Sequence, residues 1–214
     1  MFPRGVLMRW FGYGCFAFEN DESRVVFDPH DGKSLGIFAP NTDADYVFCT
    51  HNTYARNCFR CIRGTHKDVL TSIGQVDVTG FSCTGIETVS IYDDHLNVAY
   101  RFTMDGVSVL VCGCLGEVPG EDALELMKGV DIVLVPIGEY ATMSVEKVNS
   151  FLEMLDAPIV VPIEFKAGGI TLPLSNLECF SEYRDPSTYT YMGAEIEFTK
   201  EDIEGYAGTW IFDF

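Results

Sequence analysis

Short apolar segments recur along almost the whole chain, and they constrain its fold more than any other feature. They are rich in β-branched and aromatic residues and are bounded by turn residues, which is typical of β-strands. The dipeptide Asp105-Gly106 lies between two of them and indicates a hairpin. In the last segment Trp210, Phe212 and Phe214 alternate as in a half-buried strand, which indicates core packing. The sequence predicts strands at residues 6–11, 15–19, 24–28, 46–50, 86–92, 97–104, 107–112, 131–136, 158–163, 188–192, 195–199 and 209–213.

Helical periodicity is confined to three places. It is clearest at residues 145–155, which carry an apolar stripe and follow Ser144, a suitable N-cap. Further helices are expected at residues 122–128 and 174–183, the second with Ser175 as its cap. Many strands with a few peripheral helices favour two sheets packed face to face and covered by helices, which is a layered α/β architecture.

Length and charge limit the classes of protein to which the chain can belong. Its 214 residues, 47% of them hydrophobic, can bury a sizeable core, and we expect one domain over residues 1–214. The 14 basic and 32 acidic residues give a formal charge of −18, which disfavours binding to nucleic acid or to anionic membranes. No apolar run is long enough for a membrane span, and the first residues do not resemble a signal peptide, so we expect a cytoplasmic protein.

Eight cysteines raise the question of disulfides or metal binding. Thiols in the cytoplasm are normally reduced and buried cysteine behaves as a small apolar residue, so we expect most of the eight to be core or loop thiols. Cys58 and Cys61 form a single C-x-x-C motif, with His66 following, and this is a weak zinc signal. If residues 53–62 form a short helix, the two cysteines share one face, which leaves a disulfide or a metal clip open.

One loop carries a partial metal-binding motif. After the apolar run at residues 45–49 the chain reads T-H-N-T-Y-A-R at positions 50–56. This loop resembles the T-H-x-H-x-D-H loop of the metallo-β-lactamase superfamily, which also follows a buried strand and contributes ligands to two zinc ions. Of the ligands in that loop, only His51 remains here.

Further motifs of the same superfamily follow in order over residues 8–166. Near the beginning they are G-Y-G-C-F at 12–16 and F-D-P at 27–29, similar to G-H-S-C-F and I-D-P. The middle of the chain has Y-D-D at 92–94, N at 97, D-G at 105–106 and G-C-L-G at 113–116, similar to H-D-D, N, D-G and G-D-L-G. Later come P-I-G at 136–138, T-M at 142–143 and V-P-I-E at 161–164, similar to P-x-G, T-M/I and I-P-x-H. The chain is most similar to the small stand-alone branch that includes the ascorbate-6-phosphate lactonase-like proteins.

The resemblance implies a four-layer αβ/βα sandwich with an active site at one edge, where loops from both sheets meet. The family would place histidines at positions 51, 53 and 92 around the first metal. It would place an aspartate at 55 and histidines at 56 and 164 around the second, with a bridging aspartate at 114. The corresponding pocket residues of this chain are His51, Thr53, Ala55, Arg56, Tyr92, Cys114 and Glu164.

These replacements change what the site can bind. Zinc needs about four thiolate, imidazole or carboxylate donors, so His51, Cys114 and Glu164 are the acceptable ligands that remain. Tyr92 is a poor ligand at neutral pH, because the unperturbed pKa of tyrosine is about 10. Arg56 opposes metal binding, since a fixed positive charge repels a dication. We therefore expect no bound metal or other cofactor. If zinc does bind, its ligands are expected to be His51, Cys114 and Glu164.

Arg56 and Glu164 suggest a different design. A guanidinium where the second metal would lie can supply positive charge, and its planar fork suits a carboxylate. We predict an Arg56–Glu164 ion pair in place of the second metal, with His51, Thr53 and Tyr92 hydrogen-bonding where the first metal would be. The alternative is that Arg56 points into solvent, as loop arginines often do.

The remaining polar candidates have ordinary structural explanations. Tyr13 and Asp28 are expected beside the site, where Asp28 would orient its loop, although Asp-Pro is also common in turns. His30 and His95 are expected mainly at the surface. Asp93 and Asp94 precede His95 and are interpreted as a loop at the rim, since adjacent strand residues face opposite ways.

Three functional interpretations remain open. The first is a protein that has lost the dinuclear zinc site and is non-catalytic, or whose pocket binds a small molecule or a protein partner. The second is an atypical metal-dependent hydrolase with a mononuclear site at His51, Cys114 and Glu164. The third is a thiol-based activity at Cys114, because a nearby cation or imidazole lowers the pKa of a thiol. No catalytic residue, substrate or oligomeric state follows from the sequence, although the branch that the chain resembles often forms homo-oligomers.

Overall fold

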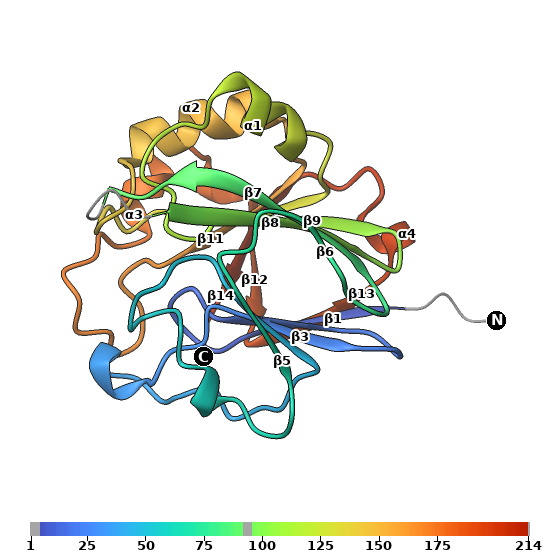
Figure 1. Ribbon diagram of the computed structural model, residues 1–214. Helices are drawn as coiled ribbons and strands as arrows, with labels where there is room; N and C mark the ends of the chain where they lie inside the picture. The colour runs from blue at the N-terminus through green and yellow to red at the C-terminus, as the bar shows by residue number, and fades with distance from the viewer. Residues whose placement is uncertain (1–4, 92–95, 214) are drawn as a thin grey trace.

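The computed structural model describes residues 5–91 and 96–213, which form two β-sheets packed face to face (Figure 1). The first sheet has the strand order β13-β1-β2-β3-β4-β5. Its strands are β1 (Val6–Trp10), β2 (Phe16–Glu19), β3 (Arg24–Phe27), β4 (Tyr46–Cys49), β5 (Lys67–Leu70) and β13 (Glu195–Phe198). The strands β3, β4 and β5 are parallel, whereas β13, β1, β2 and β3 pair antiparallel.

The second sheet has the strand order β12-β14-β11-β10-β9-β8-β7-β6. Its strands are β6 (Gly74–Val76), β7 (Ser82–Val89), β8 (Leu96–Met104), β9 (Val107–Val111), β10 (Ile132–Pro136), β11 (Ile159–Ile163), β12 (Tyr189–Gly193) and β14 (Gly208–Phe212). From β9 to β12 the strands are parallel. The hairpin predicted at Asp105-Gly106 joins β8 to β9, and both of its residues have the positive φ that such a turn requires.

Aromatic rings fill the space between the sheets. Phe102 of the second sheet packs against Phe18 and Phe27 of the first, with ring centroids 4.8 and 5.2 Å apart. Phe48 and Tyr100 meet in the same way at 4.9 Å. Trp210 and Phe212 also lie in this core, as their alternation predicts, while Phe214 is outside the described residues. The burial of this apolar surface holds the two sheets together.

Helices cover the outer face of the second sheet. They are α1 (Glu121–Met127), α2 (Val145–Leu155) and the short α3 (Glu178–Ser181), and Figure 1 shows α1 and α2 above that sheet. The predicted apolar stripe of α2 is buried and consists of Val145, Val148, Phe151, Leu152 and Leu155. The Ser144 side chain accepts a hydrogen bond from the Lys147 N–H as the N-cap of this helix. Of the helix predicted over residues 174–183 only α3 forms, and the predicted cap is wrong, because the Ser175 hydroxyl donates to Glu139 instead. The last short helix, α4 (Lys200–Ile203), has a Thr199 cap.

The outer face of the first sheet has a thinner cover. Loops lie over it, with the 3₁₀ turns η1 (Lys33–Leu35) and η2 (Phe59–Cys61), and the third such turn, η3 (Pro186–Thr188), precedes β12. Beneath these loops a small apolar cluster includes Ala17, Val26, Val47 and Ile62. The predicted layered α/β fold is therefore confirmed, but loops rather than long helices make the fourth layer. Among the described residues, no helix is long and apolar enough to cross a membrane.

Two strands are absent from the sequence prediction. They are β5 and β6, and each lies at the edge of its sheet. Edge strands tolerate charged residues and glycine because one side of the strand is open. Lys67, Asp68 and Gly74 therefore interrupt the run of apolar residues by which a strand is recognised in the sequence. The short helix considered for residues 53–62 does not form, and the helical structure in this range is the 3₁₀ turn η2.

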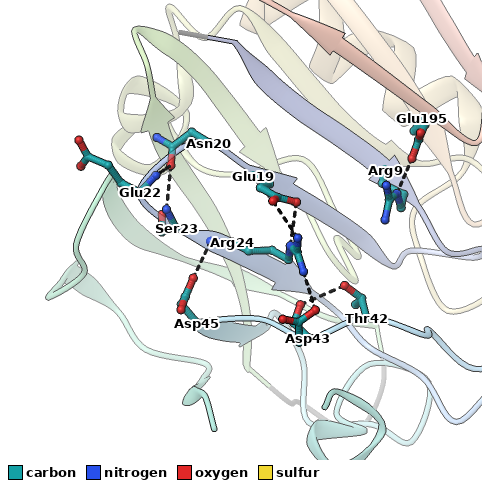
Figure 2. A network of polar contacts seen from close by, with 10 residues as sticks. All are labelled: Arg9, Glu19, Asn20, Glu22, Ser23, Arg24, Thr42, Asp43, Asp45 and Glu195. Carbon is teal, nitrogen blue, oxygen red and sulfur yellow. Dashed lines mark hydrogen bonds and ion pairs between the residues drawn. The ribbon is translucent and has the colours of Figure 1, made fainter. Parts of the chain in front are cut away.

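An ion-pair network secures the first sheet at the beginnings of β3 and β4. Figure 2 shows Arg24 with two hydrogen bonds to Glu19, at 2.8 and 2.7 Å, and a third to Asp43 at 2.6 Å. The Arg24 backbone N–H donates to Asp45, the residue before β4. These groups are partly exposed and stabilise the fold only modestly. The network therefore lies at the amino-terminal ends of β3 and β4, and the loops at their carboxyl-terminal ends are free for another role.

Candidate functional site

The candidate site lies where parallel strands of both sheets end. Asp28 directly follows β3, residues 51–56 follow β4, Cys114 follows β9, and Glu164 directly follows β11. Tyr13 comes from the turn between β1 and β2. Ligand sites in α/β proteins often form at the carboxyl ends of parallel strands, because loops from several strands converge there. Here loops from two facing sheets converge.

The predicted ion pair is present at the centre of this site. Arg56 Nη2 donates a hydrogen bond to Glu164 Oε2, and the two side chains are only 4% and 1% exposed. The guanidinium carbon lies 5.3 Å from the centre of the Tyr13 ring, within range of a cation–π interaction. The alternative in which Arg56 points into solvent is wrong.

The charges in this group depend on each other. Burial alone would lower the pKa of Arg56, but the carboxylate of Glu164 raises it well above its usual value, so the guanidinium stays charged. Burial raises the pKa of Glu164, and Arg56 acts in the opposite direction. Burial also raises the pKa of the Tyr13 hydroxyl, which is therefore protonated at neutral pH. Arg56 is thus the cation that compensates the buried carboxylates.

Asp28 connects this ion pair to the loop at residues 50–56. Its two carboxylate oxygens accept hydrogen bonds from the Thr50 N–H at 2.8 Å and the Thr50 hydroxyl at 2.7 Å. Arg56 Nε lies 3.8 Å from Asp28 Oδ2. The side chain is fully buried, and this burial raises its pKa to about 7, against the opposing effects of Arg56 and Thr50. Asp28 therefore changes charge near neutral pH.

The substitution Asp28→Asn is expected to make folding less sensitive to pH. The pKa of Asp28 is about 7 in the fold and about 3.9 in an unfolded chain, so ionisation destabilises the fold as pH rises between these values. Relative to wild type, the free energy of unfolding of the variant should rise by up to about 1.4 kcal/mol per pH unit between pH 5 and 7. Urea unfolding at several pH values measures this difference, and parallel profiles would exclude the assignment.

The other side of the site corresponds to the family's first metal. His51 is fully buried and Thr53 is partly buried. Ala55, at a position that the family uses for the second metal, is 5% exposed. The Thr53 hydroxyl has no hydrogen-bond partner among the described residues, so the predicted hydrogen bond of Thr53 is not seen there. Tyr92, Asp93, Asp94 and His95 lie outside the described residues, and the predictions made for them stay predictions.

Cys114 is held as a buried thiol. Its backbone N–H donates to Asn97 Oδ1 at 2.8 Å, and its Sγ donates to the carbonyl oxygen of Ala141 at 3.4 Å. The Ser90 hydroxyl lies 3.6 Å from the sulfur. Burial raises the pKa of this thiol, and Arg56 lowers it only in part. A raised pKa and a side chain that is 1% exposed both oppose its use as a nucleophile.

The residues present do not suit a dinuclear metal centre. Among the described residues, no three histidine, cysteine, aspartate or glutamate side chains are grouped so that they could hold a metal ion. This includes His51, Cys114 and Glu164, the three ligands expected of a mononuclear site. The carboxylate of Glu164 is instead bound by Arg56, whose positive charge would repel a metal ion beside it.

Several site residues have an uncommon backbone conformation. Tyr13, Asp28, Ala141 and Glu164 have φ values of 56°, 49°, 60° and 58°. Positive φ is uncommon for residues other than glycine and tends to occur at functional sites. At each of these residues the positive φ changes the direction of the backbone. Close packing leaves little room for a side chain at position 14, because a Cβ on Gly14 would lie 2.7 Å from Glu164 Oε1.

A cavity of about 380 Å³ opens beside the ion pair. The sequence does not single out Tyr140 and Ala141, from the loop after β10, or Leu172. The only sequence signal for the first two is their position just after the P-x-G motif. The complete lining is Tyr13, His51, Asn52, Thr53, Tyr54, Ala55, Arg56, Cys114, Tyr140, Ala141 and Leu172.

Two other candidates have structural roles. His30 is fully buried, which corrects the expectation that it lies at the surface. Its Nε2 lies 3.1 and 3.2 Å from the carbonyl oxygens of Phe11 and Gly12, and its Nδ1 accepts from the Gly32 N–H. Cys58 and Cys61 form a disulfide, which selects one of the two possibilities left open by their spacing. The disulfide encloses η2, directly after the site loop.

Comparison with known proteins agrees with the fold. The sequence profile of the beta-lactamase superfamily domain matches residues 7–164, which is well over half of the chain. The chain therefore belongs to the metallo-β-lactamase superfamily. A search of curated proteins finds no match.

Solved structures show the same fold over nearly the full chain. A protein from Thermotoga maritima, assigned as a Zn-dependent hydrolase of the metallo-β-lactamase superfamily, is 24% identical, with a TM-score of 0.82 over 97% of this chain and 98% of its own. A metallo hydrolase from the archaeon Ignicoccus hospitalis is 17% identical, with a TM-score of 0.67 over 98% and 95%. A protein from Parabacteroides distasonis, assigned as a metal-dependent hydrolase, is 16% identical, with a TM-score of 0.67 over 86% and 90%. At these identities the similarity establishes the fold alone.

Proposed function

We propose that this chain is a metallo-β-lactamase-fold protein in which an internal ion pair replaces the dinuclear zinc site, and that its cavity binds a small molecule without hydrolysing it. One observation carries the proposal. Arg56 and Glu164, at two positions where the family places ligands of the second metal, are bonded to each other and buried. Within this pair the positive charge of Arg56 balances the negative charge of Glu164, so the carboxylate does not need a metal ion as its counter-charge.

Related structures are assigned as metal-dependent hydrolases, and a mononuclear hydrolase is the natural competing proposal. It would require Glu164 to leave Arg56 and join His51 and Cys114. That change would leave the guanidinium buried without a partner, which is unfavourable by several kcal/mol. Thiol chemistry at Cys114 is also less well supported, because the sulfur is buried and donates to Ala141.

Elemental analysis after expression in zinc-supplemented medium tests the proposal. We expect substoichiometric metal and a thermal midpoint that does not change when a chelator is added, since a metal bound only to the folded state would stabilise it. A positive control restores the family's ligands with Thr53→His, Ala55→Asp, Arg56→His, Tyr92→His, Cys114→Asp and Glu164→His. Zinc uptake by this variant would show that the assay detects a working site. Stoichiometric zinc in the wild-type protein, with a midpoint lowered by the chelator, would contradict the proposal.

A further inference from the structure

The buried guanidinium of Arg56 has more donors than acceptors. An arginine carries five N–H donors, and within the described residues this one makes a single hydrogen bond, to Glu164. Its Nε is buried without an acceptor, and Asp28 Oδ2, at 3.8 Å, is too far away for a hydrogen bond. Buried donors without acceptors are costly. Because Arg56 lines the cavity, a bound molecule can supply the missing acceptors.

A second polar group in the same turn lacks a partner. The Thr53 hydroxyl is buried, lines the cavity and has no hydrogen-bond partner in the described part of the chain. The backbone N–H of Arg56 donates to the Thr53 carbonyl oxygen at 2.9 Å, so one tight turn carries both side chains. A ligand group with two acceptor oxygens can accept from both, and a planar carboxylate matches the guanidinium fork.

The rest of the cavity suits a flat apolar group. Tyr13, Tyr54 and Tyr140 contribute three aromatic rings to its wall, and Leu172 adds an aliphatic side chain. Aromatic rings favour other rings through stacked or edge-on contact. Tyr54 is 56% exposed, which places it where the cavity meets solvent. A volume of about 380 Å³ accommodates a small ring compound.

Charge limits the number of negative groups on the ligand. Arg56 is the one arginine or lysine among the described residues that line the cavity, and it is already paired with Glu164. The formal charge of the whole chain is −18, which repels polyanions. A single carboxylate is compatible with these charges, whereas a phosphate ester with two negative charges is disfavoured.

We propose that the cavity binds a small aromatic monocarboxylate, with the carboxylate on Arg56 and Thr53 and the ring among the tyrosines. This rests on the proposed function, because it requires Arg56 rather than a metal ion to anchor the ligand. It adds the chemical class of the ligand and the residues that recognise it.

Calorimetric titration of the full chain with benzoate and with benzamide tests the class of ligand. Benzamide has nearly the same shape as benzoate but no charge, so we expect benzoate to bind at least about tenfold more tightly, as expected for losing a charge-assisted hydrogen bond. Equal affinity for the two probes, or no binding of benzoate, would overturn the carboxylate assignment.

Variants test the residues. Thr53→Val keeps the shape of the side chain and is expected to weaken benzoate binding by about threefold to tenfold, whereas the exposed Thr65→Val serves as a matched control without effect. Arg56→Lys keeps the charge but removes the fork, and a loss of at least about tenfold is expected if it folds. Unchanged benzoate affinity in Thr53→Val would overturn the proposed contacts.

A titration with chelator separates this inference from the proposed function. We expect the affinity for benzoate to be the same with and without chelator. If benzoate binds more tightly than benzamide only when zinc is present, the proposed function fails, together with the assignment of Arg56 as the anchor. If both probes bind equally without metal, the proposed function stands and only the ligand class is overturned.

Discussion

The substitution Arg56→Met should lower the free energy of unfolding by about 3–5 kcal/mol, the usual cost of removing one partner of a buried ion pair. The variant leaves Glu164 buried without its cation and removes the positive charge near Asp28. Methionine fills a similar volume, so lost packing contributes little. Urea denaturation at pH 7 measures the change, and Arg60→Met, at an exposed position two residues before Ile62, is the matched control with an effect within about 0.5 kcal/mol.

The double variant Arg56→Met with Glu164→Gln isolates the charge. Neutralising the orphaned carboxylate should recover much of the lost stability, since replacing both partners of a buried pair is often close to neutral. A double-mutant cycle with Glu164→Gln alone gives the coupling energy between the two side chains. A double variant no more stable than Arg56→Met would show that the pair does not carry the stability assigned to it.

The substitution Gly138→Ala should be the second most damaging change, costing about 3 kcal/mol or more as an overpacking substitution. An added Cβ would lie 2.0 Å from the backbone carbonyl oxygen of Glu164 and 2.8 Å from the side chain of Leu174. The carbonyl belongs to the backbone and cannot move independently of Glu164. The change should therefore displace Glu164 from Arg56 as well as destabilise the fold.

The matched control for this prediction is Gly120→Ala, where an added Cβ meets no atom within 4 Å. Gly120 is the N-cap of α1, where alanine is less favourable than glycine, so a loss of no more than about 1 kcal/mol is expected. Urea unfolding of both variants gives the comparison. Equal losses for the two would mean that the contact between Gly138 and Glu164 is not a close one.

The strands that are buried on both faces were predictable because their apolar residues form continuous runs. The strands β10 and β11 are examples, and all five residues of each are buried. The edge strand β5 could not be recognised in this way, since only Val69 of its four residues is buried. Alternation and apolar runs report burial, and an edge strand has little of it.

The Arg56–Glu164 pair could be predicted because both residues occupy positions of a known family motif, although they are 108 residues apart. The part of the cavity wall formed by Tyr140 and Ala141 could not be predicted from the sequence. Tyr140 and Ala141 reach the cavity on a loop in which Glu139 and Ala141 have positive φ, and no periodic pattern encodes such a turn. His30 was misjudged for a related reason, because only the folded chain brings the Phe11 and Gly12 carbonyl groups to its ring.

Anomalous diffraction at the zinc absorption edge, from crystals soaked in zinc, tests the central claim most directly. The claim is that the Arg56–Glu164 ion pair occupies the place of the second metal. It predicts no anomalous peak between these two side chains, with the guanidinium still bonded to the carboxylate. A zinc peak ligated by Glu164, with Arg56 turned away, would contradict it.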